Sequence, residues 1–173
     1  MADAPEIPEA TKPFDKRVAL SIAIIAVVLS FVENHGDNAK TDAIIKTNAA
    51  SNQWAYFQAK SIKGQMAEMH GALLTSLSNP AAEATTAEAA RLRAEAARYD
   101  SEKAEIKAGA EALGHEATHK GTIDDRCDLA ALLLQIAVVV SSVAILSGWR
   151  LFWYAGIALG TAGTIAGTTA FLM

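Results

Sequence analysis

The sequence predicts an all-α integral membrane protein with three transmembrane helices and a long antiparallel helical hairpin, packed like a coiled coil, outside the membrane. Three observations predict this class. The 173-residue chain contains three long apolar runs without a charged residue. The charged segment between the first two runs carries a seven-residue apolar repeat, which is typical of helices that pack side by side. A single proline divides that segment into two arms of nearly equal length.

Composition excludes several classes of protein. The chain is 51% hydrophobic, and its 19 acidic and 15 basic residues leave a formal net charge of −4. Charges of both signs in near balance are not typical of a disordered tail, and a net negative chain lacks the basic face that nucleic-acid-binding proteins usually carry. A single cysteine, Cys127, excludes a disulfide framework and a cysteine-cluster metal site. We therefore expect no nucleic-acid partner.

The three apolar runs are residues 18–32, 129–146 and 151–173. Crossing about 30 Å of hydrocarbon takes roughly 20 helical residues, and the second and third runs have about that length. The first run is shorter, but the apolar stems of Lys16 and Arg17 extend it. A buried helix of a soluble protein normally keeps a polar stripe, which the second and third runs lack. We therefore expect all three runs to span the membrane.

The segments that flank the runs set the expected topology. Lysine and arginine concentrate on the cytoplasmic side of membrane proteins, and here they occur in the tail 1–17 and in the turn 147–150. We therefore expect both segments in the cytoplasm, and residues 33–128 and the C-terminus outside it. No small-x-small motif follows the first run, which favours an uncleaved anchor over a signal peptide. Four aromatic residues form the belt expected at the inner interface: Trp149, Phe152, Trp153 and Tyr154.

Residues 33–128 are expected to form the hairpin, with its turn at 78–80. Pro80 follows a Ser-Asn pair, and proline suits the first position of a helix that asparagine caps. The arms 33–78 and 81–128 contain 46 and 48 residues, so they match in length. Two equal arms joined by a turn predict antiparallel helices.

Each arm carries a seven-residue repeat that predicts the seam between the arms. In the first arm the repeat consists of Ile45, Asn52, Ala59, Met66 and Leu73, with Asn48, Ala55, Ile62 and Met69 between them. In the second arm it consists of Leu92, Tyr99, Ile106 and Leu113. The arms are rich in alanine, which favours helices but buries little area, so we expect the hairpin to pack against copies of itself.

Asparagine and glycine occur at particular points of the arms. Asn48 and Asn52 fall on the predicted seam, where they either fix the register of a coiled coil or simply face solvent. Helix breaks are expected near Gly36 and Gly121, because glycine is a poor helix former.

The segment His115–His119 matches the pattern H-E-x-x-H. On a helix His115 and His119 share one face and can bind zinc, with Glu116 as a general base. The third ligand of such sites normally comes from a separate element, and an alanine-rich, solvated arm offers no pocket that excludes water. His115 and His119 are therefore weak metal candidates, and we expect no catalytic residue and no cofactor. The absence of charge from the predicted spans argues against a proton-coupled transporter.

The third run carries four glycines on one helical face. Small residues at this spacing let helix backbones approach closely in lipid. The partner of this face is either the second run or another subunit. The residues are Gly156, Gly160, Gly163 and Gly167.

The arms contain one aromatic cluster, formed by Trp54, Tyr56 and Phe57. Trp54 and Phe57 lie one helical turn apart and share a face. We expect them to pack between the arms or between subunits. The alternative is a patch that contacts a peptide or lipid.

The stretch around this cluster, NAASNQWAYFQAKSIK, resembles a family of bacterial membrane proteins described only as domain of unknown function 4337. The run 129–146 is similar to the family's second span. The matching residues of the stretch are Ser51, Gln53, Trp54, Ala55, Tyr56, Gln58, Ala59, Lys60, Ser61 and Lys63. The resemblance implies a three-span protein of the bacterial inner membrane, with residues 33–128 in the periplasm. It implies no activity and no catalytic residues.

These observations predict a homo-oligomeric membrane scaffold or structural protein without enzymatic activity, whose expected partners are the lipid bilayer and copies of the same chain. One alternative is a channel or transport-accessory protein. A further alternative is a zinc hydrolase that uses the motif at 115–119.

Overall fold

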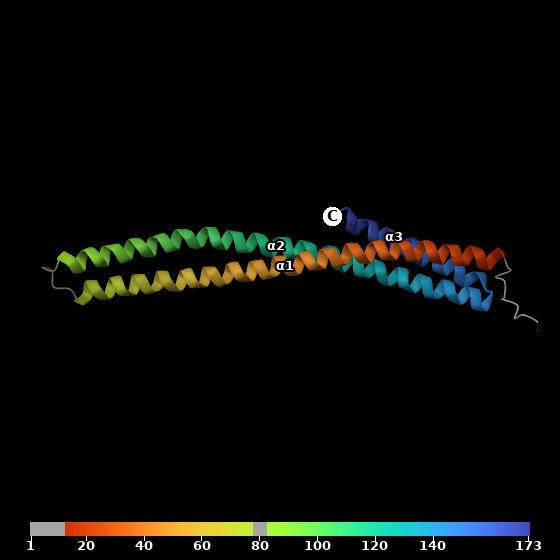
Figure 1. The fold of residues 1–173 in the computed structure, drawn as a ribbon, viewed down its shortest axis with the longest axis horizontal. Helices are drawn as coiled ribbons and strands as arrows, with labels where there is room; N and C mark the ends of the chain where they lie inside the picture. Colours follow the sequence, from red (N-terminus) through yellow and green to blue (C-terminus); the bar gives the residue numbers. More distant parts are fainter. Residues whose placement is uncertain (1–12, 78–82) are drawn as a thin grey trace, which may run out of the picture. The chain divides into compact units, whose positions relative to one another are not determined.

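The computed structural model describes residues 13–77 and 83–173, which form three α-helices (Figure 1). Helix α1 spans Pro13–Leu77, α2 spans Glu83–Ser147 and α3 spans Arg150–Phe171. The predicted all-α class is confirmed, and α1 and α2 form the predicted antiparallel hairpin. The expected turn at 78–80, and residues 1–12 of the expected tail, lie outside the described residues.

The chain divides into two units, each described here by itself. The three-helix unit contains the described residues up to Thr41 together with Lys120–Met173. The hairpin unit contains Asp42–His119.

The expected helix breaks near Gly36 and Gly121 are wrong, because both glycines lie inside uninterrupted helices. Glycine inside a helix costs about 1 kcal/mol relative to alanine, which is a preference that packing overrides. At Gly36 the reason is visible, since a Cβ atom there would lie 2.8 Å from the Cβ of Cys127. The missing side chain lets α1 and α2 approach each other at this point.

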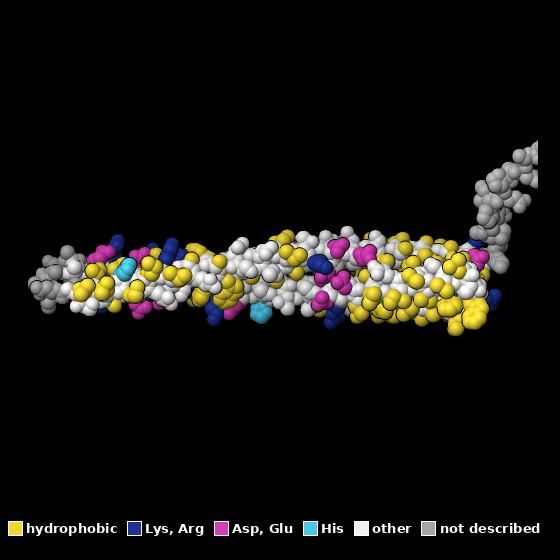
Figure 2. All heavy atoms as spheres, turned by 90° about the horizontal axis from the view of Figure 1, so that it is seen from below, with side chains coloured by type: hydrophobic (Ala, Val, Ile, Leu, Met, Phe, Trp, Pro, Cys, Tyr) yellow, Lys and Arg dark blue, Asp and Glu magenta, His cyan; other side chains and the backbone are white. Residues whose placement is uncertain are grey.

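The interior of the three-helix unit is built mainly from small residues. Ala130, Ala137 and Ala144 are fully buried, together with Leu134 and Ser141. Larger apolar side chains instead point outward from all three helices. On the face seen in Figure 2, hydrophobic side chains cover the three-helix unit between charged side chains near its two ends.

Helices α2 and α3 are joined by a short turn at the expected 147–150 connection. Gly148 has a φ of 68°, a left-handed conformation that glycine adopts without the steric cost paid by other residues. Its backbone N–H donates to the carbonyl oxygen of Ala144 at 3.0 Å, which ends α2. Helix α3 then begins at Arg150.

In the hairpin unit, the predicted seam is correct for α2 and wrong for α1. On α2, Leu92, Tyr99, Ile106 and Leu113 are all half-buried, as the repeat predicted. On α1 the predicted residues are exposed, and a different row faces α2 at alternating spacings of three and four. This inner row consists of Ala43, Lys46, Ala50, Gln53, Phe57, Lys60, Gly64, Ala67, Gly71 and Leu74.

The inner row was missed because it is built from small and amphipathic residues rather than large apolar ones. A Cβ atom at Gly64 would lie 3.4 Å from the Cβ of Tyr99, and one at Gly71 would lie 3.5 Å from the Cβ of Leu92. At these two glycines, Tyr99 and Leu92 of α2 therefore pack closely on the backbone of α1. The hydrophobic repeat by itself therefore predicts the outer row of α1 and not the inner row.

Two helices, α1 and α2, are long and apolar enough to cross a membrane. This statement rests on the length and composition of the helices. Core helices of soluble proteins and signal sequences can have the same length and composition. Helix α3, which contains the third predicted span, is not among the helices that are long and apolar enough to cross a membrane.

Candidate functional site

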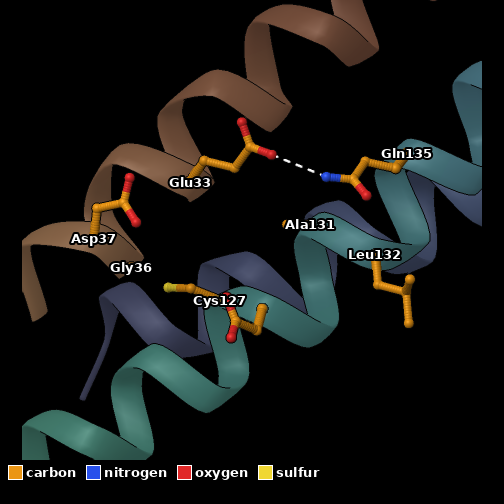
Figure 3. A pocket seen from close by; sticks show the side chains of 8 residues that line it. Glu33, Gly36, Asp37, Cys127, Ala131, Leu132 and Gln135 are labelled. Atoms are coloured by element: carbon orange, nitrogen blue, oxygen red, sulfur yellow. Dashed lines mark hydrogen bonds between the residues drawn. The ribbon is translucent and has the colours of Figure 1, made fainter. Parts of the chain in front are cut away.

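A polar pocket of about 370 Å³ lies between α1 and α2 in the three-helix unit (Figure 3). Carboxylates surround it from both helices, and a buried thiol and an amide complete its polar lining. The lining residues are Glu33, Gly36, Asp37, Cys127, Asp128, Ala131, Leu132 and Gln135. The pocket follows from the antiparallel pairing, which brings the acidic residues after the first apolar run next to those before the second.

Hydrogen bonds and ion pairs hold several of these polar side chains. The side-chain amide of Gln135 donates to the carboxylate of Glu33 at 3.0 Å, which links α2 to α1 (Figure 3). Next to the pocket, the ammonium group of Lys40 lies 3.9 Å from the carboxylate of Asp124. Burial raises the pKa of Asp124, and neighbouring carboxylates raise it further, while Lys40 acts in the opposite direction.

The thiol of Cys127 is only 1% exposed and packs against Gly36. Burial raises its pKa, and the charges of Asp124 and Asp128 add to this effect. Because the thiolate is the reactive form, a raised pKa makes this thiol a poor nucleophile. Cys127 is therefore a packing residue at this site, in agreement with its acidic surroundings in the sequence.

The pocket concentrates negative charge but does not assemble a metal site from the described residues. In residues 13–77 and 83–173, no group of three or more His, Cys, Asp or Glu side chains is placed to hold a metal ion. The arrangement favours water and loosely held cations through its charge. Both ends of the charged segment 33–128 are acidic in the sequence, but the pocket also depends on the register between the two arms, which the sequence did not provide.

The candidate metal residues His115 and His119 both lie on the exposed surface of α2. Between them, the carboxylate of Glu116 forms an ion pair with Lys46 of α1. The hydrogen bond from Lys46 lowers the pKa of Glu116, and the positive charge of Lys46 adds to the effect. The structure thus places Glu116 in a cross-helix ion pair.

The aromatic cluster lies on α1, and part of it contacts α2. Trp54 and Phe57 are half-buried and pack edge to face, with ring centroids 5.6 Å apart. The ammonium group of Lys60 lies 5.4 Å from the ring centre of Tyr56 and 5.0 Å from that of Tyr99 on α2. These are cation–π distances, so Lys60 bridges the two helices through aromatic rings.

Lys60 also pairs with Glu102 of α2. The hydrogen bond that Lys60 donates to Glu102 raises the pKa of Lys60, and the same bond lowers the pKa of Glu102. A lysine on the inner row therefore joins the two arms by charge and by ring contacts.

The glycine face of α3 packs against other helices of the same chain. A Cβ atom at Gly156 would lie 2.1 Å from the Oγ of Ser141, and one at Gly163 would lie 2.9 Å from the side chain of Leu134, both on α2. The other two glycines face α1 as well. A Cβ atom would lie 3.0 Å from Ile25 at Gly160 and 2.9 Å from Val32 at Gly167. The face is thus occupied by α1 and α2 within one chain.

The exposed outer row of α1 is the surface that sequence reasoning identified but assigned to the wrong partner. The row keeps alternating spacings of three and four along the hairpin unit, and all its residues are exposed. Its members are Ile45, Asn48, Asn52, Ala55, Ala59, Ile62, Met66, Met69 and Leu73.

Together, these features define an all-α helical-hairpin protein with two helices long and apolar enough to span a membrane. The chain belongs to the family described as Domain of unknown function (DUF4337), which matches residues 14–173. No curated protein and no solved structure matches it.

Proposed function

We propose that this protein is a homo-oligomeric scaffold of the bacterial inner membrane without enzymatic activity. In this proposal the runs 18–32, 129–146 and 151–173 cross the membrane, and the hairpin unit in the periplasm binds other copies through the outer row of α1. The exposed seven-residue repeat of that row is the observation that carries the proposal.

The apolar surface of the three-helix unit supports the membrane part. Its interior holds small residues, whereas large apolar side chains point outward, the reverse of the usual arrangement in a soluble protein. An exposed apolar surface of this extent is costly in water and carries no such cost against lipid chains. Examples at least half exposed are Leu20, Ile24, Val27, Phe31, Leu129, Leu132, Val139, Leu146, Leu151 and Ile165.

The charges at the two ends of this unit support the proposed topology. Arg17 and Arg150 line one pocket, so they lie at the same end. Lysine and arginine favour the cytoplasmic side, which would place this end inside and the acidic pocket near Asp37 outside.

Hydroxyl groups of α3 and α2 suit contact with lipid better than the lining of a channel. The hydroxyls of Thr161, Thr164 and Thr168 each donate to a backbone carbonyl oxygen of their own helix, as does that of Ser142. A hydroxyl group whose hydrogen bond is made within its own helix can face hydrocarbon.

The outer row of α1 supports the oligomeric part. Apolar residues that recur every seven positions stay on one helix face only when the helix winds around a partner. Within the described residues, α2 packs on the inner row, and the outer row stays exposed there. Ile62, Met66 and Met69 are 49–63% exposed.

A second copy of the same row is the partner that fits best. The positions beside the row are almost free of charge, with Lys63 as the one charged residue among them apart from a histidine, so two identical rows meet without a line of like charges. These positions are Ile44, Ser51, Gln58, Gln65 and Ala72 on one side, and Ala49, Tyr56, Lys63, His70 and Leu77 on the other. In a parallel pair in register, Asn48 and Asn52 would each meet the same asparagine of the copy, which is the pairing that suits a buried asparagine.

The proposal is tested by measuring the mass of the full chain in mild detergent. We expect a discrete multimer for the unchanged protein, and single chains when Ile62→Glu and Met69→Glu place charges on the row. Thr47→Glu is the matched control, because Thr47 is exposed on α1 but outside the row and its neighbours. A monodisperse monomer of the unchanged protein would overturn the proposal, and a multimer that survives the double substitution would exclude the outer row as its interface.

A further inference from the structure

A second pocket, of about 330 Å³, opens where α1 and α3 begin. Two arginines and three aromatic side chains surround it. The lining residues are Pro13, Phe14, Arg17, Arg150, Trp153 and Tyr154. We propose that this pocket binds the phosphate of an anionic phospholipid headgroup at the cytoplasmic surface, an inference that rests on the proposed membrane insertion.

The charges of the pocket suit a phosphate. No acidic side chain within residues 13–77 and 83–173 forms an ion pair with Arg17 or Arg150. A guanidinium group presents a planar fork of N–H donors that matches two phosphate oxygens, and two such groups at one pocket can share one phosphate. The helix N-termini at Pro13 and Arg150 add a partial positive charge of the same sign.

Aromatic contacts hold one wall of the pocket in place. The ring of Phe14 packs edge to face on that of Trp153, with centroids 5.8 Å apart, and the indole N–H of Trp153 donates to the Oγ of Ser21 at 3.3 Å. The guanidinium carbon of Arg150 lies 5.9 Å from the ring centre of Phe14. This cation–π contact orients the arginine at the pocket before any ligand binds.

The surroundings of the pocket favour a lipid over a free phosphate ion. Tryptophan and tyrosine concentrate at the depth of lipid headgroups, and here Trp153 and Tyr154 lie at the pocket. Directly beyond it, Leu20 and Leu151 are largely exposed and offer apolar surface to the acyl chains of the same lipid. A free phosphate would gain only the two exposed arginines, whereas a lipid would gain the apolar contacts as well.

The test places the full chain in phosphatidylcholine vesicles that contain a minor fraction of either brominated phosphatidylglycerol or brominated phosphatidylcholine. Bromine on the acyl chains quenches nearby tryptophan, so in a chain that carries Trp54→Phe and Trp149→Phe the quenching of Trp153 reports which lipid lies at the pocket. We expect stronger quenching by the anionic lipid. Arg150→Gln should lower this preference about tenfold, the value of one hydrogen bond to a charged group. Lys16→Gln is the matched control, because it removes the same charge from a residue outside the pocket. It should lower the preference for the anionic lipid less, because salt screens the charge of Lys16 at this distance.

Three results would overturn the inference. Equal quenching by both lipids in an inserted protein would exclude a headgroup site while leaving the membrane proposal intact. Displacement of the anionic lipid by inorganic phosphate, at constant ionic strength, would identify free phosphate as the ligand. A chain that alkaline carbonate strips from the vesicles would overturn the membrane proposal, and this inference with it.

Discussion

Two carboxylates of α2 illustrate how neighbouring residues decide the effect of a charge. Glu102 accepts a hydrogen bond from Lys60 between the two arms, which lowers its pKa, so its charge favours the folded state. Asp124 is half-buried beside other acidic side chains, and this partial burial and their charges raise its pKa, so its charge opposes folding. A carboxylate thus stabilises the hairpin unit at one point and destabilises the three-helix unit at another.

Replacing Asp124 by Asn should stabilise the protein at neutral pH. Because the pKa of Asp124 is higher in the folded state, its penalty exists above that folded pKa and disappears as the pH falls below its ordinary value of 3.8. We expect Asp124→Asn to raise the thermal midpoint at pH 7, and to leave it unchanged in acid. Circular dichroism melts of the full chain at several pH values measure this.

The exposed neighbour Asp125 provides the control, and Asp125→Asn should change the midpoint little. A lower midpoint for Asp124→Asn at pH 7 would mean that the ion pair with Lys40 outweighs the cost of burial.

At the scale of elements, the contact between α2 and α3 depends on missing side chains. The Cβ atom of an alanine at Gly156 would lie 2.1 Å from the Oγ of Ser141 and 3.1 Å from the carbonyl oxygen of Ala137. We expect Gly156→Ala to cost about 1–3 kcal/mol, which is typical of overpacking a filled contact. Thermal or denaturant unfolding in detergent measures the change.

The matched control for this substitution is Gly109→Ala on α2. A Cβ atom at Gly109 would have no atom within 4 Å, so alanine should only improve helix propensity and stabilise the protein by up to about 1 kcal/mol. Equal effects of the two substitutions would show that the approach of α3 to α2 is looser than the structure indicates.

The two arms also show what the sequence can and cannot predict about helix packing. Leu92 and Tyr99 are large, so their repeat in α2 was found from hydrophobicity alone, and the all-α hairpin followed. The facing row of α1 relies on Gly64 and Gly71, which carry no hydrophobic signal. Glycine at a helix contact and glycine at a helix break look the same in one sequence, and only the partner helix distinguishes them.

The acidic pocket was missed for a related reason. Its carboxylates Glu33, Asp37 and Asp128 come from two helices, and their meeting depends on the register of the pair. Hydrophobic repeats predict that two helices pair, but a shift of one turn would separate these groups without changing the repeat. The exposed outer row, in contrast, was visible in the sequence, and the structure shows that it is exposed rather than packed on α2.

At the scale of the whole molecule, the chain exposes two apolar surfaces of different kinds. In the three-helix unit the exposed side chains come from all three helices and lie around a small-residue interior, which fits a surrounding solvent of lipid. In the hairpin unit the exposed apolar side chains form one row on α1, and the unit as a whole is charged: residues 42–119 contain 10 acidic and 8 basic residues. A single apolar row on a charged unit fits a protein partner rather than a membrane.

The proposed topology predicts which residues a membrane-impermeant thiol reagent reaches. In cells with a permeabilised outer membrane, Ala108→Cys on the exposed surface of the hairpin unit should be labelled, because it would lie in the periplasm. Ser147→Cys at the end of α2 should be labelled only after the inner membrane is opened. The unchanged chain is the control, since Cys127 is buried and its pKa is raised, so it should stay unlabelled. Labelling of Ser147→Cys but not Ala108→Cys in cells with an intact inner membrane would reverse the orientation. Labelling of neither until that membrane is opened would place both residues in the cytoplasm, so run 129–146 would not cross the membrane and the proposed topology would be wrong.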